Sequence, residues 1–214
     1  MKKLLSCFAA SLLLVSFTGC GDDGDDGPSF KINEEGEIGE TDTLKLDSWA
    51  DLKFEQNENG VVTAETIAKV VPGFELYPFG DGFSGNASAS EKRHNKYAVV
   101  VPIKIDGEKS NLKMKFNDKY ELNEWYVLYK SWSGISDTKD DSITECAKYT
   151  LDINKELDDI YGKRIKDGIK SQSDQITSQI YTWEDGDYTV KNSINIMVSS
   201  GNGTIGMMLE YSRD

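Results

Sequence analysis

Apolar and polar residues alternate from Tyr97 almost to the C-terminus of this 214-residue chain, and this period-two pattern limits the possible folds more than any other feature. Successive side chains of a β-strand point to opposite faces, so alternation predicts strands with one buried face. The pattern is clearest in 97–105, 112–116, 122–132, 176–183, 188–198 and 205–211. Turn-forming pairs such as Asp106-Gly107 and Asp185-Gly186 separate the segments, which predicts antiparallel meanders.

A helix is expected before each group of three strands. Thr63 is a helix-capping residue, and Pro72-Gly73 ends the short helical pattern that follows it. Ser142-Ile143-Thr144-Glu145 forms a capping-box pattern, and helical spacing continues as far as Gly162. Each half of the domain, about 44–135 and 136–214, thus contains one helix and three strands. We predict an α+β fold in which both helices cover one face of antiparallel sheet.

The N-terminus has the features of a secretory signal. Two lysines precede the apolar stretch Leu4–Phe17, which is shorter than the roughly 20 residues that span a membrane. An ordinary cleaved signal or an uncleaved anchor fits this pattern. With Gly19 before Cys20, however, the segment resembles the lipobox of bacterial lipoproteins. The resemblance implies removal of residues 1–19, diacylation of Cys20 and attachment to the bacterial cell envelope, with the outer membrane as the expected location.

Residues 20–43 differ in composition from the rest of the chain. Nine acids and one lysine lie between Gly21 and Thr43, with little apolar surface to bury, which predicts a disordered acidic tether. Residues 44–214 then form a single globular domain. The whole chain has 24 Lys and Arg against 37 Asp and Glu, a net charge of −13. A nucleic-acid partner is excluded because such proteins need a basic surface.

Aromatic side chains are the candidate contact residues. The segment 72–90 is long, rich in glycine and aromatic, and the strand 122–132 has aromatic residues on both faces. Exposed rings suit a protein or glycan partner, whereas rings folded under the loop form a small satellite core. The predicted binding surface comprises Tyr77, Phe79, Asp81, Phe83, Trp125 and Trp132.

Residue types that often carry catalysis lack partners in this sequence. Cys146 shares an apolar helical stripe, which favours a core position over a nucleophile or an intermolecular disulfide. His94, the single histidine, is expected in a solvated polar loop. Gly80–Gly85 matches G-x-G-x-x-G, but a charged stretch and then a strand follow it, whereas dinucleotide binding requires a strand before the motif and a helix directly after it. We predict no catalytic residue, metal or cofactor.

The order of elements from Ser142 to Tyr211 resembles the small helix-plus-meander domains of bacterial envelope lipoproteins, including assembly-factor and inhibitor-like families. The resemblance implies a binding role. We therefore expect a non-catalytic module, held to the membrane by lipid, whose partner is an envelope protein or polymer. One alternative is an envelope hydrolase that uses paired carboxylates or a serine near His94. Another is an assembly lipoprotein whose sheet edge at Tyr97–Ile105 pairs with a further strand.

Overall fold

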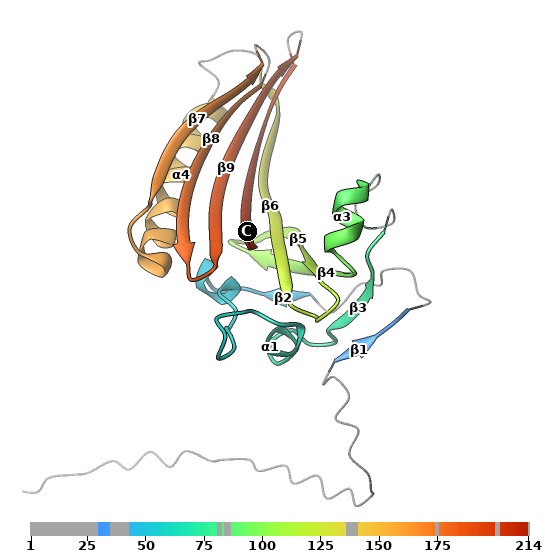
Figure 1. The fold of residues 1–214 in the computed structure, drawn as a ribbon. Helices are drawn as coiled ribbons and strands as arrows, with labels where there is room; N and C mark the ends of the chain where they lie inside the picture. The colour runs from blue at the N-terminus through green and yellow to red at the C-terminus, as the bar shows by residue number, and fades with distance from the viewer. Residues whose placement is uncertain are drawn as a thin grey trace, which may run out of the picture.

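The computed structural model describes residues 30–34, 43–80, 83, 87–135, 141–173, 176–199 and 202–213. The expected signal segment, Cys20, Asp81 and most of the predicted tether lie outside these residues. Within them, ten strands form one mixed sheet in the order β1-β3-β4-β5-β6-β10-β9-β8-β7, with β2 beside β4 (Figure 1).

The helical elements are short except for the last one. They are the 3₁₀ helix η1 (Trp49–Leu52), α1 (Ala64–Ala68), α3 (Ala89–His94) and α4 (Asp141–Tyr161). The strands are β1 (Lys31–Ile32), β2 (Leu44–Lys45), β3 (Glu75–Pro78), β4 (Tyr97–Ile105), β5 (Glu108–Phe116), β6 (Leu122–Ile135), β7 (Lys166–Ser173), β8 (Ile176–Asp185), β9 (Tyr188–Ser199) and β10 (Asn202–Arg213). Among the described helices, none combines the length and apolar character needed to cross a membrane.

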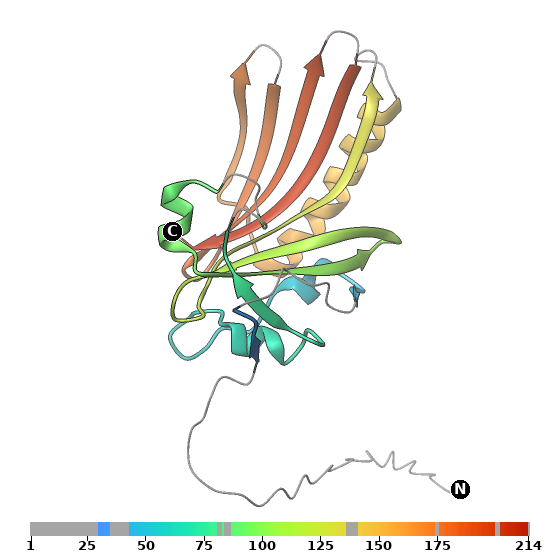
Figure 2. The ribbon, with the colours of Figure 1, turned by 90° about the vertical axis from the view of Figure 1, so that its right-hand side faces the viewer.

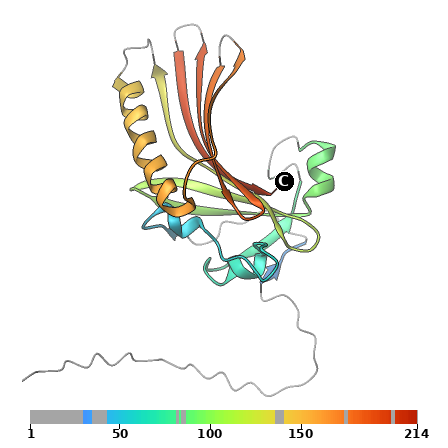
Figure 3. The same cartoon turned by 60° about the vertical axis from the view of Figure 1, so that its left-hand side comes forward.

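The predicted α+β architecture of two helix-plus-three-strand halves is wrong, because the described chain is mostly sheet. The second half has four strands, and β10 pairs with β6 so that both halves join one continuous sheet. Strand β7 was missed because its sequence KDGIKSQS does not alternate, and an edge strand needs no apolar face. The helices also do not all cover one face, since α3, a helix that the sequence did not predict, lies across the strands from α4 (Figures 2 and 3).

The individual hairpins and the long helix are confirmed. Strands β4 and β5 pair in register from Tyr97↔Phe116 to Ile105↔Glu108. Asp106 and Gly107 both have positive φ, which matches the twist of a two-residue hairpin turn. Helix α4 ends where Gly162, at φ +82°, donates its amide to Asp158 O. Glycine takes this left-handed conformation without the strain that a Cβ would add.

The core lies on the α4 side of the sheet, and an aromatic stack forms its centre. The Trp125 and Tyr211 rings are 5.5 Å apart and nearly parallel, and Tyr188 stacks on Tyr211 at 4.5 Å. The Tyr188 hydroxyl accepts from Val62 N at 3.0 Å and donates to Leu122 O at 3.1 Å. One buried phenol therefore ties the segment before α1 to the start of β6.

Residues Phe30–Glu34 fall inside the predicted tether but pack against the body of the domain. Strand β1 pairs in parallel with β3, and Lys31 forms an ion pair with Glu75 at 3.1 Å. The Phe30 ring lies 6.2 Å from that of Phe74 and 5.3 Å from that of Tyr120. Part of the predicted tether therefore belongs to the sheet.

Candidate functional site

The aromatic side chains of the segment 72–90 are largely packed against the sheet. Tyr77 lies in β3 and is buried, as is Phe83, while Phe79 is half-buried. The Phe79 and Phe83 rings are 5.6 Å apart, and Lys115 Nζ lies 5.9 Å from the Phe79 ring. The satellite-core alternative therefore holds for Tyr77 and Phe83, and neither ring is available as a contact surface.

Trp125 and Trp132 lie on the same side of β6, although strict alternation along the strand would place them on opposite faces. The β6–β10 register shifts between Met207 and Met208, so one extra residue of β6 reverses the alternation beyond it. Trp125 is completely buried in the aromatic stack and is therefore not a surface residue. Trp132 pairs with Ile205 and donates Nε1 to Glu145 Oε2 of α4 at 3.3 Å.

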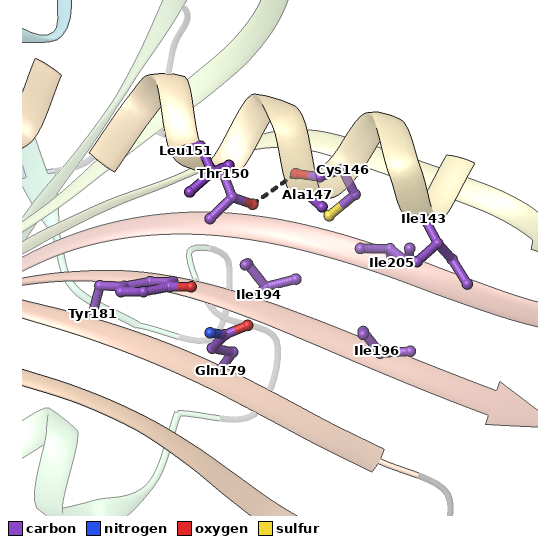
Figure 4. A pocket seen from close by; sticks show the side chains of 10 residues that line it. All are labelled: Ile143, Cys146, Ala147, Thr150, Leu151, Gln179, Tyr181, Ile194, Ile196 and Ile205. Atoms are coloured by element: carbon purple, nitrogen blue, oxygen red, sulfur yellow. Dashed lines mark hydrogen bonds between the residues drawn. The ribbon is translucent and has the colours of Figure 1, made fainter. Parts of the chain in front are cut away.

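An apolar groove runs between α4 and strands β8, β9 and β10 (Figure 4). Its volume is about 280 Å³. The lining has no charged side chain and comprises Ile143, Cys146, Ala147, Thr150, Leu151, Gln179, Tyr181, Ile194, Ile196 and Ile205. In the close view the Tyr181 phenol oxygen points toward Ile194, which places a neutral polar group beside the apolar wall.

The groove exists because α4 is held along its β6 side. Glu145 accepts from Trp132, and the Tyr149 hydroxyl donates to Asp106 Oδ2 at 3.1 Å. Toward the other end, Glu156 Oε1 accepts from Trp49 N at 2.7 Å. On the β8 side, Leu151 remains 68% exposed. The first half of α4 is therefore held on its β6 side and leaves a groove toward β8, while its C-terminal end meets β8 through the bond from Trp183 to Asp158.

A buried amide chain fixes the middle of α4 over the sheet. The Tyr129 hydroxyl donates to Asn192 Oδ1 at 2.7 Å, and Asn192 Nδ2 donates to Asn154 Oδ1 at 2.8 Å. Burial raises the pKa of Tyr129, so this phenol stays a donor. Because these buried hydrogen bonds form in only one arrangement, they set the position of α4 along the strands.

Cys146 lies in the groove wall as a core residue, as the sequence predicted. Its side chain is 5% exposed, and Sγ lies 3.9 Å from Met207 Sδ. Burial raises the pKa of the thiol, whereas a nucleophilic cysteine needs a lowered one. The thiol therefore contributes apolar surface to the groove.

His94 is exposed, as predicted, but it ends helix α3 rather than lying in a loop. It lines a polar cleft of about 480 Å³ that also contains Glu121, Glu124 and Ser212. This is the constellation that the hydrolase alternative requires. Each group, however, has another partner: His94 Nδ1 binds Ser90 O at 2.8 Å, Ser212 Oγ donates to Glu210, Glu121 pairs with Arg213 and Glu124 pairs with Lys115. Among the described contacts, no serine hydroxyl meets the imidazole of His94.

Two acids that stand beside another acid in the sequence, Asp158 and Asp185, make structural contacts. Asp158 Oδ1 accepts from Trp183 Nε1 at 3.0 Å and pairs with Arg164 at 3.1 Å. Asp185 Oδ2 accepts from the Tyr211 hydroxyl at 2.8 Å. Among the residues that the structure describes, no group of three or more His, Cys, Asp and Glu could hold a metal ion.

The predicted free edge at Tyr97–Ile105 is occupied at its two ends, at Tyr97–Ala98 by β3 and at Ile103–Lys104 by β2. Strand β4 pairs with β5 on one side and with β3 and β2 on the other.

Comparison with family models, curated proteins and solved structures gives no match. The candidate functional sites are therefore the α4 groove and the polar cleft.

Sequence reasoning missed the groove because its lining residues had been assigned to the core. The available signal was Leu151, which lies off the apolar stripe of α4 that contains Cys146 and Ile153. A stripe wide enough to include it covers more of the helix surface than one sheet face buries. The residues on β9, Ile194 and Ile196, gave no separate signal because they continue the ordinary strand alternation.

Proposed function

We propose that this chain is a lipid-anchored protein of the bacterial envelope that acts as a non-catalytic binding module, and that its α4 groove holds an acyl-chain-sized part of the ligand. The observation that carries the proposal is a groove without charged lining residues whose rim residue Leu151 is exposed to water. Covering apolar surface is the main favourable contribution to association.

The size of the groove favours a single chain over a folded partner. Its volume of about 280 Å³ lies near the lower end of the range of about 300–1,000 Å³ for small-molecule sites. Each methylene group that leaves water contributes about 0.8 kcal/mol before the costs of association. The neutral side chains of Gln179 and Tyr181 offer hydrogen bonds to a polar head group.

A fatty-acid titration tests the groove. The full chain carrying Cys20→Ser, which needs no detergent, is titrated with the fluorescent fatty acid cis-parinaric acid. Leu151→Glu places a charge on the rim and is expected to weaken binding about tenfold, since about 1.4 kcal/mol corresponds to that factor. The matched control is Leu128→Glu, an exposed leucine on β6 that does not line the groove.

Two results would overturn the groove assignment. One is the absence of saturable emission from the parent chain. The other is an equal loss of affinity in Leu151→Glu and Leu128→Glu, which would indicate a general effect of added charge. Thermal unfolding of both variants establishes that each is folded before its affinity is compared.

The anchor is tested separately, because it rests on the lipobox resemblance at Cys20. Cells grown with an alkyne-labelled fatty acid are expected to label the parent chain and the Cys7→Ser control, and to leave Cys20→Ser unlabelled. Labelling of Cys20→Ser would contradict lipidation at this residue. The two experiments are independent, so failure of one leaves the other proposal standing.

A further inference from the structure

The polar cleft lies on the face of the sheet opposite the α4 groove. Ser212 and Glu124 are register partners, as are the neighbouring Tyr211 and Trp125, which are buried on the core side. Because successive strand residues alternate, Ser212 and Glu124 point the other way. Figures 2 and 3 show α3 beside the C-terminal end of β10, across the strands from α4.

Three distant parts of the chain build the cleft, and all of its lining residues are polar. They are the end of α3, the β5–β6 turn with the start of β6, and the end of β10. The lining comprises His94, Asn95, Asn117, Glu121, Asn123, Glu124, Ser212 and Arg213. A cleft of about 480 Å³ lined by charged and amide side chains is poorly suited to an acyl chain.

Hydrogen bonds within the cleft hold its polar groups in place before any ligand arrives. Asn123 Nδ2 donates to His94 O and to Asn95 Oδ1, both at 2.9 Å, and so joins α3 to β6. On the other wall, Asn117 Nδ2 donates to Glu121 Oε2 at 2.9 Å, and Arg213 pairs with the same oxygen at 3.2 Å. Such preorganisation lowers the entropy cost of binding.

Both carboxylates of the cleft lining already have a cation partner. Glu121 pairs with Arg213, and Glu124 pairs with Lys115, whose Nζ lies 3.1 Å from Glu124 Oε2 and 3.5 Å from Glu91 Oε1. Paired charges attract a free ion less strongly than unpaired charges do. The paired charges and the polar lining residues together favour a ligand that is neutral and rich in hydroxyl groups.

The cleft presents both acceptors and donors to such a ligand. His94 Nδ1 donates to Ser90 O, so Nε2 of the neutral ring is an acceptor. Asn123 uses only its Nδ2 in the described contacts, which leaves Oδ1 to accept, and Arg213 has guanidinium N–H groups beyond the one that meets Glu121. A hydroxyl group both donates and accepts, and therefore matches this mixed set.

We propose that this cleft is a saccharide-binding site. It takes a neutral sugar whose hydroxyl groups donate to His94 Nε2, Asn123 Oδ1 and Glu124 Oε1 and accept from Arg213. The site is separate from the acyl-chain groove in position and in chemistry. It would give the module a second contact, with a glycan, on the opposite face.

The single histidine supplies a direct reporter, because His94 is the only imidazole in the chain. The full Cys20→Ser chain is titrated at constant pH with triacetylchitotriose and with maltotriose, and the imidazole resonances are followed by NMR. At least one trisaccharide is expected to shift them saturably. Inorganic phosphate and hexanoate, which probe charge and apolar character, are expected to shift them little.

Two variants test the assigned residues. Asn123→Ala removes the organising amide, and Glu124→Gln keeps the shape of a cleft residue if Asn123→Ala fails to fold. Each is expected to weaken trisaccharide binding at least tenfold. The matched control, Leu151→Glu in the groove, is expected to bind trisaccharide like the parent chain, which separates this proposal from the acyl-chain proposal.

Three results would overturn the saccharide site. The first is the absence of a shift with either trisaccharide up to its solubility limit. The second is an equal shift with phosphate or hexanoate, which would indicate a response to charge or apolar surface. The third is unchanged trisaccharide affinity in a folded Asn123→Ala or Glu124→Gln variant.

Discussion

Trp132 donates its indole Nε1 to Glu145 Oε2 at 3.3 Å and thereby ties the first turns of α4 to β6. The bond closes one side of the helix, while Leu151 stays exposed above the other. An aromatic residue that the sequence marked as a contact surface thus holds the wall of the groove instead.

Trp132→Phe keeps a ring beside α4 and removes the N–H donor. We expect faster amide hydrogen exchange in the first turns of α4 and a loss of at most about 1 kcal/mol in unfolding free energy, because the bond is solvent-exposed. Glu145→Gln retains an acceptor and is expected to have a smaller effect. Unchanged exchange in Trp132→Phe would show that other contacts seat the helix.

Tyr188→Phe removes the buried hydroxyl that pairs with both Val62 N and Leu122 O. Because a donor and an acceptor then stay buried without this partner, we expect a loss of about 2–3 kcal/mol in chemical denaturation. Tyr126→Phe is the control, since Tyr126 is half-buried, and it is expected to stay within about 0.5 kcal/mol of the parent. Equal losses in both variants would contradict this role for Tyr188.

Cys146 is expected to react slowly with Ellman's reagent in the native chain at pH 8. Burial excludes the reagent and raises the pKa of the thiol, so little reactive thiolate forms. Denaturant is expected to restore rapid reaction, and Cys146→Ser identifies the signal of this thiol. Rapid native labelling would show that the groove wall opens readily.

Glu91 makes the docking of α3 sensitive to acid. Its carboxylate accepts from Ser88 N, and this bond, followed by the Ser88 hydroxyl and Lys115, lowers the pKa of Glu91 below its ordinary value of 4.5. A lowered folded-state pKa contributes stability above pH 4.5 that is lost as the pH falls through the folded pKa. Exchange of α3 amides is expected to accelerate over that acidic range.

Glu91→Gln provides the comparison for this pH dependence. It removes the titrating carboxylate, so α3 amide exchange is expected to depend less on acid than in the parent chain. The charge on Lys115 stays in place because Glu124 remains its partner at 3.1 Å. An identical acid profile in Glu91→Gln would assign the effect to another group.

Phe30→Ala is expected to release β1 from β3. Phe30 packs against Phe74 and Tyr120, and its loss leaves β1 with a two-residue pairing. Trypsin cleavage after Lys31 is expected to accelerate about tenfold, which corresponds to about 1.4 kcal/mol of lost docking. Ile165→Ala, an exposed apolar residue outside this contact, serves as the control. Equal cleavage in both variants would show that Phe30 does not dock the strand.

The hairpins could be predicted because their signals are local. In β4 the alternating residues Val99, Val101 and Ile103 mark a buried face, and Asp106-Gly107 suits the two positive φ values of the turn. The capping pattern and the apolar stripe likewise predict α4, although the helix begins at Asp141, two residues before the expected Ile143, and ends at Tyr161. Each of these features depends on residues close together in the chain, so no knowledge of distant partners is needed.

Both hollows escaped prediction because they depend on distant pairing. The β6–β10 seam joins residues about 80 positions apart, and the register shift at Met207/Met208 turns Trp132 toward α4. The cleft likewise requires His94, Asn123 and Arg213 to meet across three segments. Alternation specifies that a strand has two faces, whereas only the packed sheet decides which residues share a face and which distant segments border it.

The amino-acid sequence by itself determined six alternating strands, the turns between them, the long helix and the core position of Cys146. The tertiary structure decided that both halves share one sheet, that Trp125 is buried and that a groove opens between α4 and β8. The physical reason is the range of the interactions. Backbone preferences and side-chain periodicity act over a few residues, while burial and pairing depend on what the rest of the chain brings alongside.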